Sequence, residues 1–226
     1  HFELDKIFTD FENDPDLWVA IVTGAGNKAF SAGNDLKWQA EGHATGRPDS
    51  GFAGLVSRYT MQKPLIAAVN GLAMGGGFEV ALACDIIIAA ENAFFALPEP
   101  RVGLAALAGG LHRLSRQIPM KQAMGMILTG RRVMAEEGYK LGFVTEVVPE
   151  GDALASALRW AEQILECSPV SIRTSKDVVN RGDEFASVRE AFEADYQSVR
   201  DMQNSLDFIE GPLAFSEKRA PDWKGR

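Results

Sequence analysis

"NGLAMGGGFEVALACD" occupies residues 70–85 and places three consecutive glycines, Gly75, Gly76 and Gly77, in front of a carboxylate, Glu79, inside an apolar run. Glycine is the least favourable ordinary residue for a helix interior, and a buried carboxylate is costly. Glycines between a strand and a helix let the backbone approach another group closely. The first amides of a helix are unpaired, so they can stabilise negative charge on an oxygen. Close packing of helix on strand explains the same glycines, and this stretch alone does not separate the two interpretations.

Short apolar runs on both sides of this stretch have the character of buried strands. They contain β-branched residues and alanine and are bounded by turn residues or charges. The runs are "LWVAIVTG" (17–24), "PLIAAVNG" (64–71), "DIIIAAE" (85–91) and "AFFAL" (93–97). The glycines open a short helix between the second and third runs. This alternation predicts an α/β fold with buried, parallel strands.

Beyond Gly103 the pattern is mostly helical. The sequence predicts two helices separated by Pro119, a helix closed by Gly142 and a short strand, "FVTEVVP". Further helices are predicted over 152–167, 169–181, 184–204 and 205–218. We therefore divide the chain into an α/β core, residues 1–150, and a helical C-terminal region, residues 151–226. The segment 41–51, rich in glycine, proline and polar residues, is predicted to be the mobile one.

Composition excludes several classes of protein. The chain has 226 residues, 46% of them hydrophobic, and a net charge of -8. An acidic balance argues against non-specific binding to nucleic acid or an anionic membrane, which needs a basic face. The apolar stretch 64–90 contains Glu79, Asp85 and repeated glycines, so it does not fit a membrane span.

The cysteines and histidines predict no metal site. Cys84 and Cys167 are far apart and lack metal-ligand spacing, as do the three scattered histidines. Two unpaired cysteines fit a reducing compartment, with both as small core residues. The N-terminal sequence has no secretory signal pattern, so we expect a cytoplasmic protein.

One motif invites a different interpretation. "GAGNKA" (24–29) follows a strand and matches the dinucleotide pattern G-x-G-x-x-A, with Glu41 at about the position of a ribose-binding acid. A true fingerprint opens a helix whose N-terminus receives the pyrophosphate. Here "FSAGNDL" (30–36) intervenes, with no helical pattern before Asp35. A tight turn after a strand is the favoured interpretation.

The turn "FSAGNDL" also follows a strand and contains Gly33. This turn and the triple glycine, each offering one amide, would form a two-donor oxyanion hole. Asp35 has a simpler possible role, as the N-cap of the following helix.

Two carboxylates complete the candidate chemistry. Glu79 lies one helical turn after Gly76, and Glu99 lies between Pro98 and Pro100, which stiffen the backbone around it. A surface turn carrying an incidental glutamate would also explain Glu99. Together, two glutamates and two oxyanion amides can move a proton to or from carbon, activate water and stabilise an enolate.

At these residues the sequence resembles the crotonase superfamily of enoyl-CoA hydratases and isomerases, and most closely its carnitinyl-CoA dehydratase-like (crotonobetainyl-CoA hydratase-like) hydratases. The resemblance covers the chain from about residue 14 and implies a spiral of ββα units followed by helices. It rests on "AFSAGNDLK", "NGLAMGGGFEVALACD", "FFALPEPRVGL", "GRRVMAEEGYKLGFVTEVVP" and "EGPLAFSEKRAPDWKGR", with "GFAGL" supporting the subgroup.

The resemblance implies specific roles. The amides of Asn34 and Gly76 would hold the thioester oxygen, Glu79 would orient and activate a water, and Glu99 would deliver or remove the C2 proton. The implied reaction is reversible addition of water across the C2–C3 bond of an acyl-CoA thioester. It needs no metal or redox cofactor because the thioester stabilises the enolate, and coenzyme A enters as part of the substrate.

The resemblance also implies a binding surface for the coenzyme A ester. Phe215 and Lys218 resemble residues that reach coenzyme A from a neighbouring subunit, in a homotrimer or a dimer of trimers. For Lys37 and Lys218, a solvated surface lysine is the alternative. The full set of binding residues is Ala32, Asp35, Leu36, Lys37, Gly75, Phe215 and Lys218.

The chain departs from the family pattern in three places. It begins partway into the first helix, so the preceding strand is missing from this sequence. Asn34 stands where a small residue or tryptophan is usual. "VGLAALAGG" (102–110) makes one wall apolar, which favours a plain acyl chain over a trimethylammonium group. An isomerase, a carnitinyl-CoA dehydratase and a non-catalytic CoA-ester-binding protein remain as alternatives.

Overall fold

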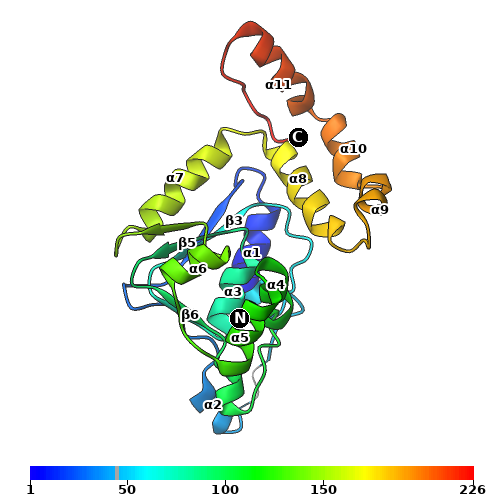
Figure 1. The fold of residues 1–226 in the computed structure, drawn as a ribbon. Coiled ribbons are helices and arrows are strands. Elements are labelled where there is room, and N and C mark those ends of the chain that lie inside the picture. The colour runs from blue at the N-terminus through cyan, green and yellow to red at the C-terminus, as the bar shows by residue number, and fades with distance from the viewer. Residues whose placement is uncertain (44–45) are drawn as a thin grey trace.

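The α/β core contains two sheets, and its first six strands alternate between them (Figure 1). The computed structural model describes residues 1–43 and 46–226. Within these ranges the strands form two four-stranded sheets, ordered β1-β3-β5-β8 and β2-β4-β6-β7. The strands are β1 (Ala20–Thr23), β2 (Ala29–Ser31), β3 (Leu65–Val69), β4 (Leu72–Met74), β5 (Ile86–Ala90), β6 (Phe94–Ala96), β7 (Val133–Met134) and β8 (Glu146–Val148).

The chain passes three times from a strand of the first sheet to the next strand of the second, and α3 follows the second pass. All pairs are parallel except β6 with β7, which is antiparallel. The predicted α/β class with parallel strands and repeated ββα units is therefore confirmed.

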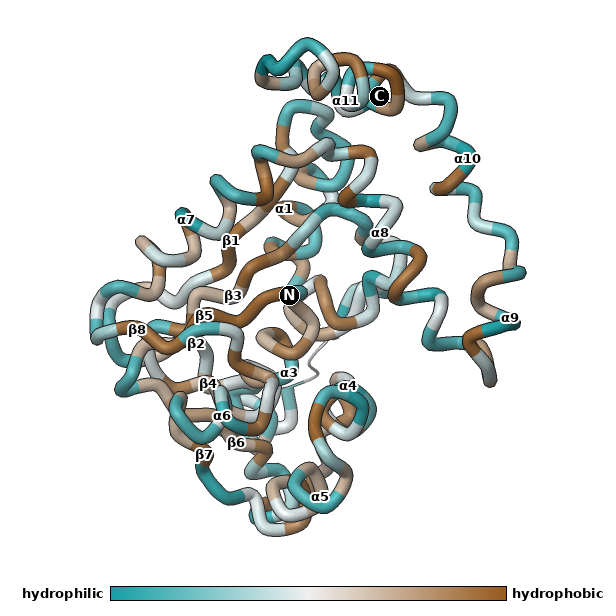
Figure 2. The backbone as a smooth tube through the Cα atoms, turned by 45° about the horizontal axis from the view of Figure 1, so that its top comes forward, coloured by the Kyte–Doolittle hydropathy of each residue, from teal (hydrophilic) through white to brown (hydrophobic). Residues whose placement is uncertain are grey.

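Strand β3 lies at the centre of the first sheet because it is apolar on both faces. Ile66 pairs with Ile21 on one side and Ile86 on the other, and every residue of β3 is buried. Figure 2 shows β3 and β5 as brown, hydrophobic segments. A strand covered on both faces reads as a continuous apolar run, which is why this element was predictable.

The helices cover the sheets and form the C-terminal part of the molecule. Helix α7 packs against β1, β3 and β5, whereas α3 packs against β2, β4 and α4. The helices are α1 (Phe2–Asn13), α2 (Leu36–Ala40), α3 (Gly76–Ala83), α4 (Gly110–Gln117), α5 (Met120–Thr129), α6 (Ala135–Leu141), α7 (Ala153–Leu165), α8 (Pro169–Gly182), α9 (Val188–Glu193), α10 (Gln197–Gln203) and α11 (Leu206–Glu217), with short 3-10 helices η1 (Phe52–Gly54) and η2 (Glu99–Val102).

An aromatic cluster anchors α3 in the core. The ring of Phe78 lies 5.1 Å from that of Phe95 and 5.2 Å from that of Phe143, centroid to centroid. Such tilted aromatic pairs bury large apolar areas with specific geometry. They fix the rotation of α3 and therefore the direction in which its polar side chain, Glu79, projects.

The predicted single helix 184–204 is wrong. It is two helices, α9 and α10, separated by extended backbone at Ala194. The break lets the buried Tyr196 turn inward, where its hydroxyl donates to the carbonyl of Ala191 at 2.8 Å. The prediction also missed β2, β4 and β7, because strands of two or three residues are too short to show a period of two.

Two further predictions concern single residues and the loop 41–51. Cys84 is buried as expected, but Cys167 is exposed in the turn after α7, so it is not a core residue. Residues 44 and 45, inside the segment predicted to be mobile, lie outside the described residues.

Of the helices in 1–43 and 46–226, none combines the length and apolar composition needed to cross a bilayer.

Helices α8 to α11 extend away from the sheets (Figure 1). Helix α8 packs against α9 and α10, and its Lys176 donates to Asp85 Oδ2 at 2.7 Å, which ties it to the start of β5. This arrangement agrees with a helical C-terminal region. The boundary at residue 150 and a role of residues 151–226 in trimerisation remain predictions.

Candidate active site

Each of the three glycines lies against a different neighbour. A β-carbon added to Gly75 would lie 2.8 Å from Oε1 of Glu99, and one added to Gly76 would lie 2.5 Å from Cζ of Phe52. One added to Gly77 would collide with the carbonyl oxygen of Ser31. Gly75 also has φ of 52°, in the region that favours glycine. Close packing therefore accounts for all three glycines, and it brings a carboxylate to the start of α3.

The two glycine-containing turns predicted to act together lie side by side. Gly33 has φ of 85°, and a β-carbon there would lie 2.9 Å from the amide nitrogen of Gly76. Asn34 follows Gly33 directly, so the turn that contains it meets the N-terminus of α3. No side chain caps that end of α3 within the described part of the chain. Two segments separated by about 40 residues thus meet at the first amide of this helix.

Glu79 is the buried polar group of α3. Its side chain is 3% exposed, and Oε1 accepts a hydrogen bond from the amide of Gly110 at 2.9 Å. Burial raises the pKa of Glu79 from 4.5 to about 7, the Gly110 bond opposes the rise, and the charge of Glu99 adds to it. The group therefore changes protonation near neutral pH, as a general acid or base should.

Glu99 starts η2, directly after Pro98. The Nε of Arg101 in the same short helix donates to the carbonyl of Thr129 at 2.9 Å, which fixes η2 against the end of α5. Burial raises the pKa of Glu99. Its Oε2 is buried and has no hydrogen-bond partner among the described residues. An unpaired buried acceptor costs free energy, and sites that keep one commonly use it.

The prediction that Glu79 and Glu99 face a common site agrees with this geometry. Glu99 lies against Gly75, one residue before α3, while Glu79 projects from the first turn of α3. Burial raises the pKa of both carboxyl groups, and the charge of Glu99 adds to the rise at Glu79. The alternative of an incidental surface glutamate at position 99 does not fit its buried oxygen.

The loop after residue 46 supplies groups that the sequence did not single out. The ring of Phe52 fills the space in front of Gly76, and the guanidinium carbon of Arg47 lies 5.6 Å from the centroid of that ring. Ala53, with φ of 54°, donates its amide to Nδ1 of His1 at 3.1 Å. Only "GFAGL" hinted at this segment, as a motif, and nothing local in it revealed the contact with α3.

The predicted cap at Asp35 is confirmed. Its Oδ1 accepts hydrogen bonds from the amides of Lys37 and Trp38 at 3.0 and 3.1 Å, at the start of α2. The side chain of Asn34 donates to Oε1 of Gln39 at 2.7 Å. The side chains of Asp35 and Asn34 are thus both engaged within the turn and α2.

Most of the other predicted binding residues are on the surface. Ala32, Leu36 and Lys37 are exposed around the same turn. Phe215, which is 86% exposed, and Lys218 lie on and just after α11, far from α3 and α2 in the same chain (Figure 1). One copy of the chain therefore does not bring Phe215 and Lys218 to the carboxylates, and their contact with coenzyme A remains a prediction.

The dinucleotide interpretation of "GAGNKA" is wrong. Residues 25–28 form bends that lead into β2 and not into a helix, so no helix N-terminus follows the glycines. Asn70 holds this turn, because its side-chain amide donates to the carbonyl of Gly24 at 3.0 Å. Within 1–43 and 46–226, no three His, Cys, Asp or Glu side chains are arranged to hold a metal ion.

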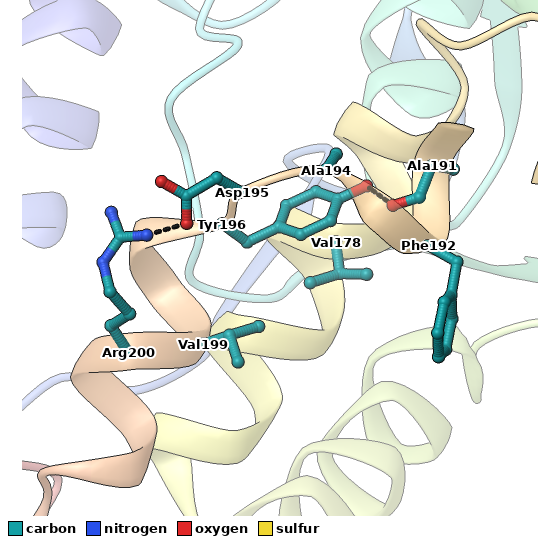
Figure 3. A pocket seen from close by; sticks show the side chains of 8 residues that line it. All are labelled: Val178, Ala191, Phe192, Ala194, Asp195, Tyr196, Val199 and Arg200. Atoms are coloured by element: carbon teal, nitrogen blue, oxygen red, sulfur yellow. Dashed lines mark hydrogen bonds and ion pairs between the residues drawn. The ribbon is translucent and has the colours of Figure 1, made fainter. Parts of the chain in front are cut away.

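A groove of about 290 Å³ lies elsewhere, between α8, α9 and α10 (Figure 3). It has apolar walls, and the described charges at its edge, Asp195 and Arg200, pair with each other. It contains no pair of carboxylates with raised pKa, so it is not the candidate site for acid–base chemistry. Its lining residues are Val178, Ala191, Phe192, Ala194, Asp195, Tyr196, Val199 and Arg200.

Comparison with known proteins agrees with the fold and with the motifs. The family model "Enoyl-CoA hydratase/isomerase" matches residues 1–226. The carnitinyl-CoA dehydratase of Escherichia coli O157:H7 is 45% identical over 236 residues, which cover 100% of this chain and 88% of that protein.

Solved structures give the same result. An enoyl-CoA hydratase from Mycobacterium tuberculosis H37Rv superimposes with a TM-score of 0.92 at 37% identity, over 99% of this chain and 87% of the other. A carnitinyl-CoA hydratase from Mycobacterium avium has a TM-score of 0.76 at 41% identity, again over 99% and 87%.

Proposed function

This chain is an enzyme that belongs to the enoyl-CoA hydratase/isomerase family, and from that premise we propose that it adds water reversibly across the C2–C3 double bond of a 2-enoyl-CoA thioester. The observation that carries this proposal is the pair Glu79 and Glu99, two carboxylates with raised pKa values around the N-terminus of α3. An isomerase, which only moves a double bond, has less need of two such groups.

In this proposal the amides of Asn34 and Gly76 receive the thioester oxygen. The packing of Gly33 against the Gly76 amide supports it, because the two turns then present neighbouring donors. Negative charge on that oxygen grows as the enolate forms, and preorganised amides stabilise it without reorganisation. Losing one such donor typically costs about 10²–10³ in rate.

The two carboxyl groups divide the proton transfers. In hydration, the oxygen of water bonds to C3 and passes a proton to ionised Glu79, while protonated Glu99 delivers a proton to C2. In dehydration each transfer reverses, and exchange with solvent resets the pair after each turnover. A pKa of about 7 for Glu79 keeps both of its protonation states accessible at neutral pH. Oε2 of Glu99 has no hydrogen-bond partner among the described residues, so it is the oxygen proposed to face C2.

No metal or redox cofactor is part of this proposal. The thioester carbonyl itself delocalises the carbanion, and addition of water changes no oxidation state overall. Coenzyme A enters as part of the substrate, with Lys37, Phe215 and Lys218 as proposed contacts.

The names of the relatives favour one specific substrate. The similar proteins from Escherichia coli and Mycobacterium avium are called carnitinyl-CoA dehydratase and carnitinyl-CoA hydratase. Dehydration of carnitinyl-CoA is therefore the second candidate activity, and it uses the same two carboxyl groups.

The experiment is a spectrophotometric assay of the purified protein. Crotonyl-CoA is the substrate, and loss of the enoyl-thioester absorbance reports hydration. We expect Glu99→Gln to lower kcat by about 10²-fold or more, the size typical of a general acid–base group. The exposed Glu150→Gln should keep normal turnover. Normal turnover by Glu99→Gln would exclude the proposed role of Glu99, and binding of CoA esters without turnover would favour a non-catalytic protein.

We also propose a cytoplasmic homotrimer or dimer of trimers, built through residues 151–226. Large apolar side chains on the C-terminal helices support an assembly, because Phe192, Ile209 and Phe215 are 88, 67 and 86% exposed. Exposed apolar patches commonly mark interfaces between protein chains. Light scattering on the purified protein measures the number of copies directly.

A further inference from the structure

Arg47 is a cation next to the proposed reaction centre. Its guanidinium carbon lies 5.6 Å from the centroid of Phe52, whose ring tip packs against Gly76. Its charge also reaches Glu79, whose ionised form it favours. Arg47 therefore lies near the N-terminus of α3, where Glu79 and Glu99 are. Phe215 and Lys218, two of the residues proposed to contact coenzyme A, belong to α11 and its C-terminal end, far from α3 (Figure 1).

No carboxylate of the described residues lies within 4.0 Å of the Arg47 guanidinium. Its described contact is the face of the Phe52 ring. Arg58 shows the contrast, because it bonds two carboxylates, Asp5 at 2.6 Å and Glu12 at 3.0 Å. A guanidinium is a planar fork that matches a carboxylate in two parallel hydrogen bonds, so Arg47 is equipped to receive one.

A second cation lies near Glu79: the charge of Glu79 favours the charged form of Arg113 on α4, but Nη2 of Arg113 already donates to the carbonyl of Val56 at 2.8 Å. Ala106 is buried beside Glu79, with 2% of its surface exposed. A β-carbon added to Gly110 would lie 3.0 Å from the β-carbon of Ala106 and 3.0 Å from Cγ of Glu79, so both side chains border Gly110. Ala106 therefore adds no charge beside Glu79, and an apolar wall formed by "VGLAALAGG" (102–110) stays a prediction. The exposed cation next to Phe52 is Arg47.

We infer that Arg47 selects the charge of the acyl group, and that the preferred substrate is an enoyl-CoA whose acyl chain ends in a carboxylate. This inference rests on the proposed function and specifies its substrate class. A terminal carboxylate would pair with Arg47, while a methyl group gains nothing from the charge. A trimethylammonium group would meet a like charge, and it would find the face of Phe52 already covered by the guanidinium.

Three substrates that differ only at the far end of a four-carbon enoyl unit separate these outcomes. Crotonyl-CoA ends in a methyl group, glutaconyl-CoA carries a carboxylate on that carbon, and crotonobetainyl-CoA carries a trimethylammonium group there. The quantity compared is kcat/KM for each substrate relative to crotonyl-CoA. The ratio cancels general effects on the catalytic groups.

We expect the native enzyme to favour glutaconyl-CoA and to disfavour crotonobetainyl-CoA. In Arg47→Met, which keeps chain length and removes the charge, the relative kcat/KM for glutaconyl-CoA should fall by about 5-fold, the upper scale of one exposed charge pair. The value for crotonobetainyl-CoA should rise. Arg47→Lys should keep part of the preference, because it keeps the charge and loses the fork.

A matched control is available in Arg132→Met. Arg132 is exposed and lies 4.7 Å above the ring of Phe94, a similar cation–aromatic contact away from the loop 46–54. It should leave all three ratios unchanged. A native preference for crotonobetainyl-CoA, or ratios that do not move in Arg47→Met, would overturn the inference.

Binding separates this inference from the proposed function. Calorimetry with the saturated esters glutaryl-CoA and butyryl-CoA needs no turnover. Tighter binding of glutaryl-CoA that is lost in Arg47→Met supports the inference even if crotonyl-CoA is never hydrated, an outcome that would reject only the hydratase proposal. Equal binding of the two esters by the native protein would overturn the inference on its own.

Discussion

Replacing Glu79 by glutamine should stabilise the protein at alkaline pH and leave its stability unchanged in acid. Burial raises the pKa of Glu79 from 4.5 to about 7, so the folded protein resists ionisation of this group. A group whose folded pKa is raised contributes stability below its unfolded pKa and loses that contribution as pH rises through the folded pKa. Here the loss occurs between about pH 4.5 and 7.

The magnitude follows from the same shift. One pKa unit is about 1.4 kcal/mol, so the rise corresponds to about 3 kcal/mol. Glutamine has nearly the same shape, carries no charge and can still accept the hydrogen bond from Gly110. We therefore expect Glu79→Gln to raise the free energy of unfolding by about 2–3 kcal/mol at pH 8.5 and by almost nothing at pH 4.5.

The assay is urea unfolding at several pH values between 4.5 and 8.5, with the protein concentration held constant because assembly contributes to apparent stability. The exposed Glu150→Gln is the control and should stay within about 0.5 kcal/mol of the native protein. A difference between Glu79→Gln and the native protein that does not grow with pH would refute the argument that Glu79 is ionised at a cost.

Three further changes test the packing around the site. Gly76→Ala places a β-carbon 2.5 Å from Cζ of Phe52 and should cost about 1–3 kcal/mol of stability as well as activity. Adding Phe52→Leu removes the tip of the ring and should recover part of both losses. If the losses in the double variant are strictly additive, the added β-carbon and the ring of Phe52 do not clash. Arg113→Met removes the hydrogen bond from Nη2 to the carbonyl of Val56 (2.8 Å), which holds α4 in place. Because α4 also carries the Gly110 amide that binds Glu79, this variant should lower kcat more than it changes KM in the crotonyl-CoA assay. An unchanged kcat would contradict this prediction. Asp35→Ala removes both cap bonds of α2 and should cost about 0.5–2 kcal/mol in urea unfolding, with Asp35→Asn retaining most of the stability.

Local patterns predicted the elements that are long or strongly apolar. The predictions of strand β3 and helix α3 are confirmed. An uninterrupted apolar run indicates the strand and a run that begins with glycines indicates the helix, and each pattern lies within about ten residues. The break at Ala194 was missed because its cause is a contact, the burial of Tyr196 against α9, and not a local breaker such as proline.

The candidate site was predictable in part for the same reason. Glu79 and Glu99 lie in recognisable motifs, so the sequence singled them out. The amide of Gly110, the ring of Phe52 and the charge of Arg47 come from residues between 27 and 32 positions away from Glu79 in the sequence. No local pattern encodes which of many backbone amides or rings will meet a given side chain.

Local sequence patterns were enough to predict the α/β class, the order of the main elements and the two carboxylates, because burial and periodicity act over short stretches of chain. Only the tertiary structure decided why three glycines stand together: Gly75 makes room for Glu99, Gly76 for Phe52 and Gly77 for Ser31. Tertiary structure also decided the protonation of Glu79, because removal of a carboxylate from water depends on every segment that covers it.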